Sequence, residues 1–282
     1  MQTVGEWLYS AHAKLTTSDH FEDDVQLTLK FLLEARLHRY RPFLSDETLT
    51  PQENKQLDAD LVALTQGKPL PYVIGEWSFY GYEFLLTPAV LIPRPETELL
   101  VEEALNWLET NRFEHSPRVY DIGTGSGIIA ITIAKRYSDC SVLASDISPD
   151  AITVCEQNIH KHNIDNRVSA ILTKNIPEGQ EEIDLLCANL PYIPEKLVDE
   201  LRVSVSEPRL ALDGGPDGLR IIEDVLKQST SRMSKTSLLL FEIEASQKQS
   251  ALLLTEKIYP HSKISVLKDL AGKDRLLRIE NK

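Results

Sequence analysis

Residues 118–127 read RVYDIGTGSG, and the fold class is inferred outward from this pattern. The run 118–122 is typical of a short buried strand, and the three glycines that follow indicate a tight turn into a helix. Ligands of open parallel sheets bind at such strand ends, because glycines let main-chain amides approach them. The spacing differs from the dinucleotide G-x-G-x-x-G, and the lysine of a phosphate-binding P-loop is missing. The stretch is either a tight turn alone or a cofactor loop formed by Gly123, Thr124, Gly125, Ser126 and Gly127.

An acidic residue at the end of the next strand favours the cofactor loop. Asp146 follows the largely apolar run SVLAS. A carboxylate in this position accepts hydrogen bonds from the two vicinal hydroxyls of a ribose. Its other interpretation is a cap for the helix at Ser148-Pro149, which has a capping serine of its own. Loop and acid together favour a nucleoside cofactor without a pyrophosphate, and S-adenosylmethionine fits that description. Both features resemble motifs of class I methyltransferases.

The pattern around this loop predicts the fold class and the domains. From residue 118 onward, short apolar runs alternate with helical segments, which is typical of a mainly parallel sheet covered on both faces. The last segment, residues 261–280, is expected to form an antiparallel strand pair. We therefore expect residues 91–282 to form an α/β catalytic domain with the Rossmann-like class I S-adenosylmethionine-dependent methyltransferase fold.

The N-terminal part of the chain has a different sequence pattern. Residues 1–70 repeat leucines at helical spacing, so a small helical domain is expected there, with helix starts at Ser18-Asp19 and Thr50-Pro51. Residues 71–90 are rich in aromatic and β-branched side chains with glycine punctuation, and we interpret them as a β-hairpin connector.

A second motif, Asn189-Leu190-Pro191-Tyr192, follows the apolar strand IDLLCA. The side-chain oxygen of Asn189 and a backbone carbonyl can accept both N–H bonds of an NH₂ group, while Tyr192 packs against its plane. Asparagine and proline are also common turn residues, so the motif alone can arise in an ordinary turn. After the fourth strand of a sheet that already carries the glycine loop, the site interpretation is favoured.

The motif resembles the (N/D)PP(Y/F) sequence of amino-group methyltransferases, with Leu190 in place of the first proline. Asn-Leu-Pro-Tyr also occurs among rRNA adenine dimethyltransferases, so it does not select the substrate. Four other segments resemble the PrmC/HemK family of release factor glutamine methyltransferases. They are GEWSFYGYEF (75–84), IPRPETE (92–98), EPRLALDGGPDGL (207–219) and DLAGKDR (269–275).

This resemblance implies an enzyme that uses S-adenosylmethionine to methylate the side-chain amide (N5) of the glutamine in the Gly-Gly-Gln motif of class I peptide chain release factors. Such methylation modulates translation termination. Asn189, Pro191 and Tyr192 are then catalytic, and Leu190 joins them in binding the substrate. Asn189 also adjoins the cofactor, and the helical domain recognises the substrate.

The chain departs from the family pattern in two further places. Glu244 stands where the family carries a glycine, and Asn175-Ile176 stand where an acid and an aromatic residue contact the adenine. Adenine contacts in that stretch are therefore not assigned.

Charge and cysteine content bear on the partners. With 30 Lys+Arg against 43 Asp+Glu, the net charge is −13, which disfavours nucleic acid and anionic membranes as partners. Three isolated cysteines and the absence of clustered ligands predict no metal site. We expect a cytoplasmic monomer without an N-terminal targeting segment. Two rivals remain open: an adenine-nitrogen methyltransferase acting on RNA or DNA, and a non-enzymatic scaffold that binds the cofactor.

Overall fold

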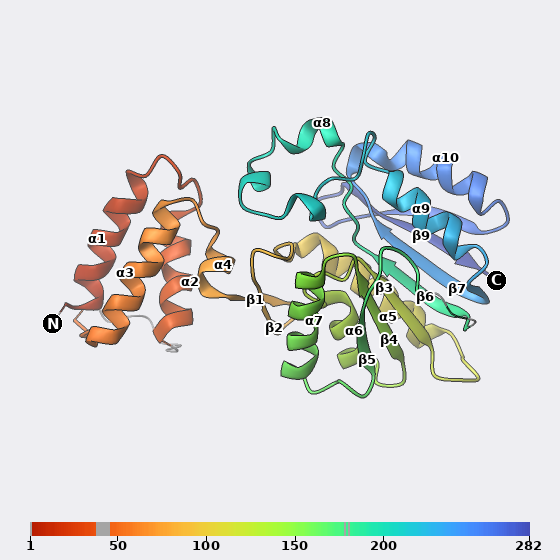
Figure 1. Ribbon diagram of the computed structural model, residues 1–282, viewed down its shortest axis with the longest axis horizontal. Helices are drawn as coiled ribbons and strands as arrows, with labels where there is room; N and C mark the ends of the chain where they lie inside the picture. The colour runs from red at the N-terminus through yellow and green to blue at the C-terminus, as the bar shows by residue number, and fades with distance from the viewer. Residues whose placement is uncertain (1, 38–45, 178, 180) are drawn as a thin grey trace. The chain divides into compact units, whose positions relative to one another are not determined.

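The computed structural model describes residues 2–37, 46–177, 179 and 181–282 (Figure 1). The chain divides into two compact units, Met1–Trp77 and Ser78–Lys282. None of the helices among the described residues combines the length and apolar character needed to cross a lipid bilayer.

The first unit is helical. Its buried side chains are mainly leucines that recur at helical spacing and form one core. The helices are α1 (Val4–Thr16), α2 (Val25–Leu37), α3 (Pro51–Thr65) and α4 (Leu70–Ile74).

One predicted helix start is confirmed and the other is wrong. The Thr50 side chain accepts a hydrogen bond from the amide of Glu53, and α3 begins at the next residue, as expected from Thr50-Pro51. The Ser18 hydroxyl instead donates to the Thr65 carbonyl, 2.9 Å away, and is not a helix cap. The α2 helix begins only at Val25, where the side chain of Asp24 accepts the amide of Leu27.

The aromatic segment is only partly extended. Its beginning, Leu70–Ile74, is the short helix α4, because Pro71 suits a first helical turn and Gly75 ends the helix at φ 87°. Strands β1 (Glu76–Phe79) and β2 (Tyr82–Leu85) then form a two-stranded sheet. Tyr80 and Gly81 join them with φ angles of 51° and 79°, the sign that a type I′ hairpin turn requires.

The second unit is built on a seven-stranded sheet in the order β5-β4-β3-β6-β7-β9-β8. Its strands are β3 (Arg118–Ile122), β4 (Ser141–Asp146), β5 (Val168–Leu172), β6 (Ile183–Ala188), β7 (Met233–Glu242), β8 (Lys263–Lys268) and β9 (Asp274–Asn281). The strands from β5 to β7 run parallel, and β9 lies antiparallel to β7 and β8. The expected mainly parallel sheet and the C-terminal antiparallel pair are thus confirmed.

Helices cover the sheet on both sides (Figure 1). They are α5 (Glu98–Thr110), α6 (Ile128–Arg136), α7 (Pro149–Lys161), α9 (Arg220–Ser229) and α10 (Lys248–Ile258). The short helix α8 (Glu195–Val198) belongs to the loop that follows β6. Short 3-10 turns are η1 (Pro95–Thr97), η2 (Arg202–Val205), η3 (Arg209–Ala211) and η4 (Ala245–Gln247).

Strand alternation divides the apolar residues between two cores. In β6, Leu185 and Cys187 pack with α5, α6 and α7, whereas Leu186 and Ala188 pack with α9 and α10. All six residues of β6 are buried, because this central strand has a core on each face. The apolar run IDLLCA therefore carries the following loop, with Asn189, to the edge of the sheet where ligands bind.

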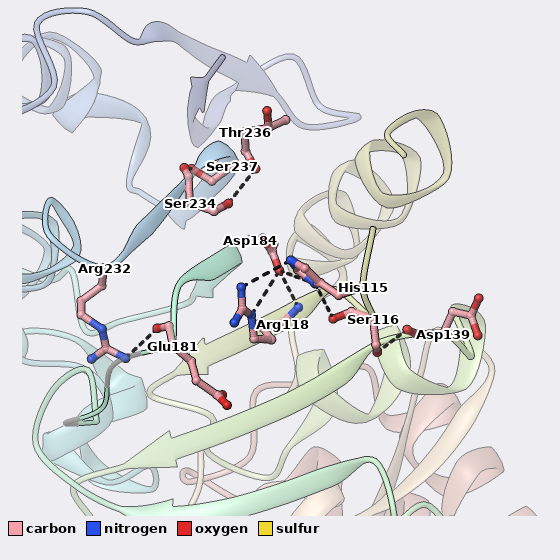
Figure 2. Close-up of polar contacts among 10 residues, drawn as sticks. All are labelled: His115, Ser116, Arg118, Asp139, Glu181, Asp184, Arg232, Ser234, Thr236 and Ser237. Carbon is pink, nitrogen blue, oxygen red and sulfur yellow. Dashed lines mark hydrogen bonds and ion pairs between the residues drawn. The ribbon is translucent and has the colours of Figure 1, made fainter. Parts of the chain in front are cut away.

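The amino ends of the strands are held by a separate polar cluster (Figure 2). The Asp184 carboxylate, at the start of β6, accepts the Arg118 amide at 2.9 Å and faces the Arg118 guanidinium at 3.6 Å. His115 Nδ1 lies 3.9 Å from the same carboxylate oxygen. Nearby, Arg232 donates to the carbonyl of Glu181, ahead of β6. The Asp184 contacts join the starts of β3 and β6, and the Arg232 contact joins the starts of β6 and β7, at the edge opposite the glycine loop.

Candidate active site

A cavity of about 530 Å³ opens at the carboxyl edge of the sheet, within the second unit. This volume lies in the range of small-molecule sites. The loops after β3, β4, β5 and β6 line it, together with parts of 89–97 and 208–224.

The glycine loop lies against this cavity in the positive-φ conformation that favours glycine. Gly123, Gly125 and Gly127 have φ angles of 73°, 55° and 85°. Thr124 and Ser126 also line the cavity with the first two glycines. A side chain at Gly125 would meet nothing within 4 Å, so the main chain is open to a ligand there.

Gly127 has a different task from the other glycines. It is not among the described residues that line the cavity. A Cβ atom here would lie 2.8 Å from the Cys155 sulfur and 2.9 Å from a methyl group of Ile131. Glycine at this position therefore permits close packing of the loop on α6 and α7, behind the predicted cofactor site.

Asp146 lines the cavity and is held by two backbone amides. Its carboxylate oxygens accept the amides of Gly125 and Ser148, each at 2.9 Å. Ser148 caps α7 with its own hydroxyl, which accepts the Ala151 amide. A carboxylate has about four acceptor positions, so two remain for a ligand. The role of Asp146 in binding ribose stays a prediction.

Asp121 is buried beneath the same loop. One carboxylate oxygen accepts the Thr124 hydroxyl at 2.6 Å and the Ala130 amide at 3.2 Å. The other oxygen has no hydrogen-bond partner among the described groups. Burial raises the pKa of Asp121 to about 7, against the lowering effect of these two donors, and nearby Asp146 adds to the rise.

Of the two residues after β5 for which the sequence assigned no cofactor contact, only one reaches the cavity. Asn175 lines the cavity with Thr173 and Lys174. Ile176 is buried in the core beside α9 and α10. Asn175 is thus placed to contact a ligand, whereas Ile176 is a packing residue.

The predicted tetrapeptide is divided between the cavity and the protein interior. Asn189, Leu190 and Pro191 line the cavity. Tyr192 is not among the described lining residues, and its hydroxyl donates to a Glu242 oxygen at 3.3 Å. The expected substrate contact of Tyr192 therefore stays a prediction. The Leu190 side chain packs against Gly123, where a Cβ atom would lie only 2.9 Å from it.

Two further residues tie Asn189 to the end of β7. The Asn189 side-chain nitrogen lies 3.1 Å from the Thr97 hydroxyl, and that hydroxyl donates to Glu242 at 2.8 Å. Thr97 and Glu242 are almost completely buried. Burial raises the pKa of Glu242, although the Thr97 hydroxyl, Arg275 and the Tyr192 hydroxyl act in the opposite direction.

The segment 207–219 supports the tetrapeptide backbone. A Cβ atom at Gly214 would lie 2.6 Å from the Pro191 carbonyl oxygen, and one at Gly218 would lie 2.1 Å from that of Tyr192. The Gln247 side chain donates to the same Tyr192 carbonyl at 2.8 Å. The glycines of DGGPDGL therefore allow two loops to touch through their main chains.

Glu207 joins segments 92–98 and 207–219, which both contribute to the cavity lining. Its buried carboxylate accepts the Ile92 amide at 3.1 Å and pairs with the Arg94 guanidinium. Both segments are visible in the sequence, but their mutual contact is not. Asn158 is a second residue that the sequence did not single out, and it bonds Leu85 and the Ser126 carbonyl.

The described residues suit S-adenosylmethionine. The open main chain at Gly125 and the paired oxygens of Asp146 can receive the polar groups of a nucleoside. Ile128 and Ile147 supply apolar surface, and Asn189 lies in the same cavity.

Comparisons with known proteins agree with this arrangement. The ribosomal protein L11 methyltransferase family model matches residues 101–247. The ribosomal protein L11 methylase structure from Lactobacillus delbrueckii subsp. bulgaricus covers 70% of this chain and 84% of its own, with a TM-score of 0.51 at 24% identity. The hMettl16 catalytic domain, solved with an RNA hairpin, matches 97% of this chain and 91% of its own with a TM-score of 0.55 at 13% identity. Both structures support the fold alone, the class I S-adenosylmethionine-dependent methyltransferase fold.

Sequence relatives identify the family. The release factor glutamine methyltransferase of Clostridium botulinum is 34% identical over 90% of this chain and 91% of its own. The enzymes of the same name from Streptococcus pneumoniae and Moorella thermoacetica are 35% and 40% identical over 85% and 74% of this chain, and over the same shares of their own. With such identities over most of each chain, this chain belongs to the release factor glutamine methyltransferase family.

Proposed function

We propose that this protein transfers a methyl group from S-adenosylmethionine to the side-chain amide nitrogen of a glutamine in peptide chain release factors. The observation that carries the proposal is the family membership, combined with an asparagine amide in the cofactor cavity. The resemblance of residues 92–98 and 207–219 to the PrmC/HemK family supports the Gly-Gly-Gln glutamine of class I factors as the acceptor.

The difficulty of this reaction lies in the acceptor. An amide nitrogen is a poor nucleophile, because its lone pair is delocalised into the carbonyl group. Bound S-adenosylmethionine supplies an electrophilic methyl group on a sulfonium centre. The protein's contribution is to orient the amide and draw electron density onto its nitrogen, and good orientation lowers barriers by up to about 7–11 kcal/mol.

Asn189 and Leu190 would carry out this task. The Asn189 side-chain oxygen and the Leu190 carbonyl would accept the two N–H bonds of the acceptor amide. Replacing the family's proline by leucine keeps this carbonyl, and the Leu190 side chain is accommodated against Gly123. The nitrogen would bond the methyl carbon as the carbon–sulfur bond of the sulfonium breaks and a neutral thioether leaves, and it would then release one proton to solvent, so no strong general base is needed.

The net charge of −13 supports a protein acceptor over nucleic acid. We propose that the protein works in the cytoplasm as a monomer, without a direct nucleic-acid or membrane partner. The helical first unit would recognise the release factor.

The test is methyl transfer to a purified class I release factor, followed by mass spectrometry of its Gly-Gly-Gln peptide. We expect a mass increase of one methyl group on the glutamine and none in a factor carrying alanine there. Ribosomal RNA serves as the alternative acceptor. Methylated adenine without methylated protein would revert the assignment to a nucleic-acid enzyme, and cofactor binding without any transfer would favour a scaffold.

A further inference from the structure

Glu242 and Thr97 form a buried link from β7 to Asn189 that the proposed chemistry does not by itself require. Thr97 ends η1 and Glu242 ends β7, yet their side-chain oxygens lie 2.8 Å apart. The Tyr192 hydroxyl also donates to Glu242, so each oxygen of this carboxylate accepts a hydrogen bond from one hydroxyl. The link therefore reaches the first and last residues of the tetrapeptide.

The direction of each hydrogen bond follows from counting protons. An ionised carboxylate only accepts hydrogen bonds, whereas a threonine hydroxyl has a single proton to donate. Thr97 gives that proton to Glu242, so its oxygen can only accept from Asn189. Asn189 must then turn its NH₂ group toward Thr97. Its side-chain oxygen is left without a donor from the described part of the chain, and Asn189 lines the cavity.

We infer that Thr97 and Glu242 are positioning residues, which hold the Asn189 amide with its oxygen available to the acceptor glutamine. This inference rests on the proposed function. An asparagine amide turned by 180° would present NH₂ to the acceptor's own NH₂, and two donors cannot bond each other. The Glu242 carboxylate excludes that orientation through Thr97.

The protonation state of Glu242 determines which way the Asn189 amide is turned. Glu242 is buried, and its charged or titratable neighbours are Arg275 on β9, Tyr192 after β6 and Glu96 on η1. Burial and Glu96 raise the pKa of Glu242, while Arg275 and Tyr192 lower it. A protonated Glu242 can donate to Thr97, which frees the Thr97 proton for the Asn189 oxygen. Turnover at saturating cofactor is therefore expected to fall as the pH falls through this raised pKa.

The central variant is Thr97→Val, which keeps the shape of the side chain and removes the hydroxyl. We expect kcat on the release factor to fall about 100-fold, since small misplacements of a reacting group cost that much. KM for S-adenosylmethionine is expected to stay within about threefold, because Thr97 holds the acceptor side of the site. Thr97→Ser keeps the hydroxyl and is expected to recover kcat to within about threefold of the natural chain.

The matched control is Thr132→Val. Thr132 is also fully buried, but its hydroxyl has no partner among the described groups and lies on α6. Its replacement is expected to leave kcat and KM unchanged. Equal losses in Thr97→Val and Thr132→Val would reduce Thr97 to a packing residue and overturn the inference.

Glu242→Gln provides a second, independent variant. Its amide can donate to Thr97, so kcat is expected to fall at every pH and to lose the acid limb seen in the natural chain. An unchanged acid limb in Glu242→Gln would remove Glu242 from the positioning role. If the natural chain itself fails to methylate release factors, the proposed function fails, whereas turnover that is insensitive to Thr97→Val sinks only this inference.

A measurement without cofactor or substrate completes the test. In ¹⁵N-labelled protein, the side-chain NH₂ signal of Asn189 is identified by its loss in Asn189→Ala. We expect this signal to shift in Thr97→Val and to return toward its natural position in Thr97→Ser. A signal that is identical in all three proteins would show that Thr97 does not hold the Asn189 amide.

Discussion

The buried carboxylates at the two edges of the central sheet have different bonded neighbours. At the amino edge, Asp184 faces the guanidinium of Arg118 and the ring of His115 (Figure 2). At the carboxyl edge, the direct hydrogen-bond donors to Asp121 and Glu242 are hydroxyls and a backbone amide, and burial raises the pKa of both acids. Charge at one edge is compensated and stabilises the strands. At the other edge no cation within the described ranges is hydrogen-bonded to the two acids, so burial disfavours their charged form, and their hydroxyl and amide donors fix polar groups around the cavity.

The comparison is tested most severely by Asn189→Ala at the carboxyl edge. We expect the turnover of release factor to fall by about 1000-fold or more, because the variant lacks an acceptor for the substrate amide. The thermal unfolding temperature is expected to change little, since the Asn189 side chain is only partly buried. Asn189→Asp, in which an oxygen replaces the NH₂ facing Thr97, is also expected to lose turnover. Natural rates in the alanine variant would remove Asn189 from the site.

The converse change is Asp184→Ala at the amino edge. The variant leaves the Arg118 amide without its charged acceptor and the partly exposed Arg118 guanidinium without its partner. Hydrogen bonds to charged groups contribute about 1.5–3 kcal/mol, and we expect a loss of this size in the free energy of unfolding. At a temperature where the variant is folded, kcat is expected to match that of the natural chain. Asp199→Ala, which breaks an exposed pair with Arg209, is the control and is expected to unfold like the natural protein. A large loss of kcat in folded Asp184→Ala would contradict the assignment of stability to the amino edge and of turnover to the carboxyl edge.

A smaller effect than that of Asn189→Ala is expected from Asp146→Ala. Hydrogen bonds to a charged group contribute about 1.5–3 kcal/mol, so the affinity for S-adenosylmethionine is expected to fall about tenfold to a hundredfold. Titration calorimetry measures this directly. Asp150→Ala changes an exposed acid in the first turn of α7 and is expected to bind normally. Equal affinities in all three proteins would exclude Asp146 as a cofactor ligand.

The last prediction concerns the pH dependence of stability. Asp121 has a pKa of about 7 in the folded protein against an ordinary value of 3.8, so between these values the folded state holds a proton that the unfolded state lacks. Its contribution is therefore full at low pH and is lost as the pH rises through about 7. In urea unfolding without cofactor, Asp121→Asn is expected to decline less than the natural chain between about pH 5 and pH 8. Parallel curves for the two proteins would contradict this.

What the sequence predicted well depends on local patterns. The glycine loop, the acid ending β4 and the tetrapeptide after β6 each follow an apolar strand, and parallel strands bring their carboxyl ends to one edge. The short helix α4 was not predicted, because its aromatic and β-branched residues are also typical of strands. Here Pro71 and Gly75 decided the local structure.

The rest of the site depends on contacts between distant parts of the chain. Thr97 and Glu242 are 145 residues apart, and Ile92 and Glu207 are 115 apart, so no spacing in the sequence relates them. The departure at Glu244 has a local explanation, since its side chain accepts the Ser246 amide and caps η4. A glycine there would lack this cap.

The close approach of Gly218 to the Tyr192 carbonyl has a consequence for mutational tolerance. A saturation library scored for release factor methylation would normally place its intolerant positions among residues that touch a ligand. Gly218 is not among the described residues that line the cavity, yet even alanine there would place a carbon 2.1 Å from a main-chain oxygen of the tetrapeptide. Its substitution profile would therefore be as narrow as that of Asn189. Positions that tolerate no substitution would therefore occur in the supporting loop as well as among the residues that line the cavity.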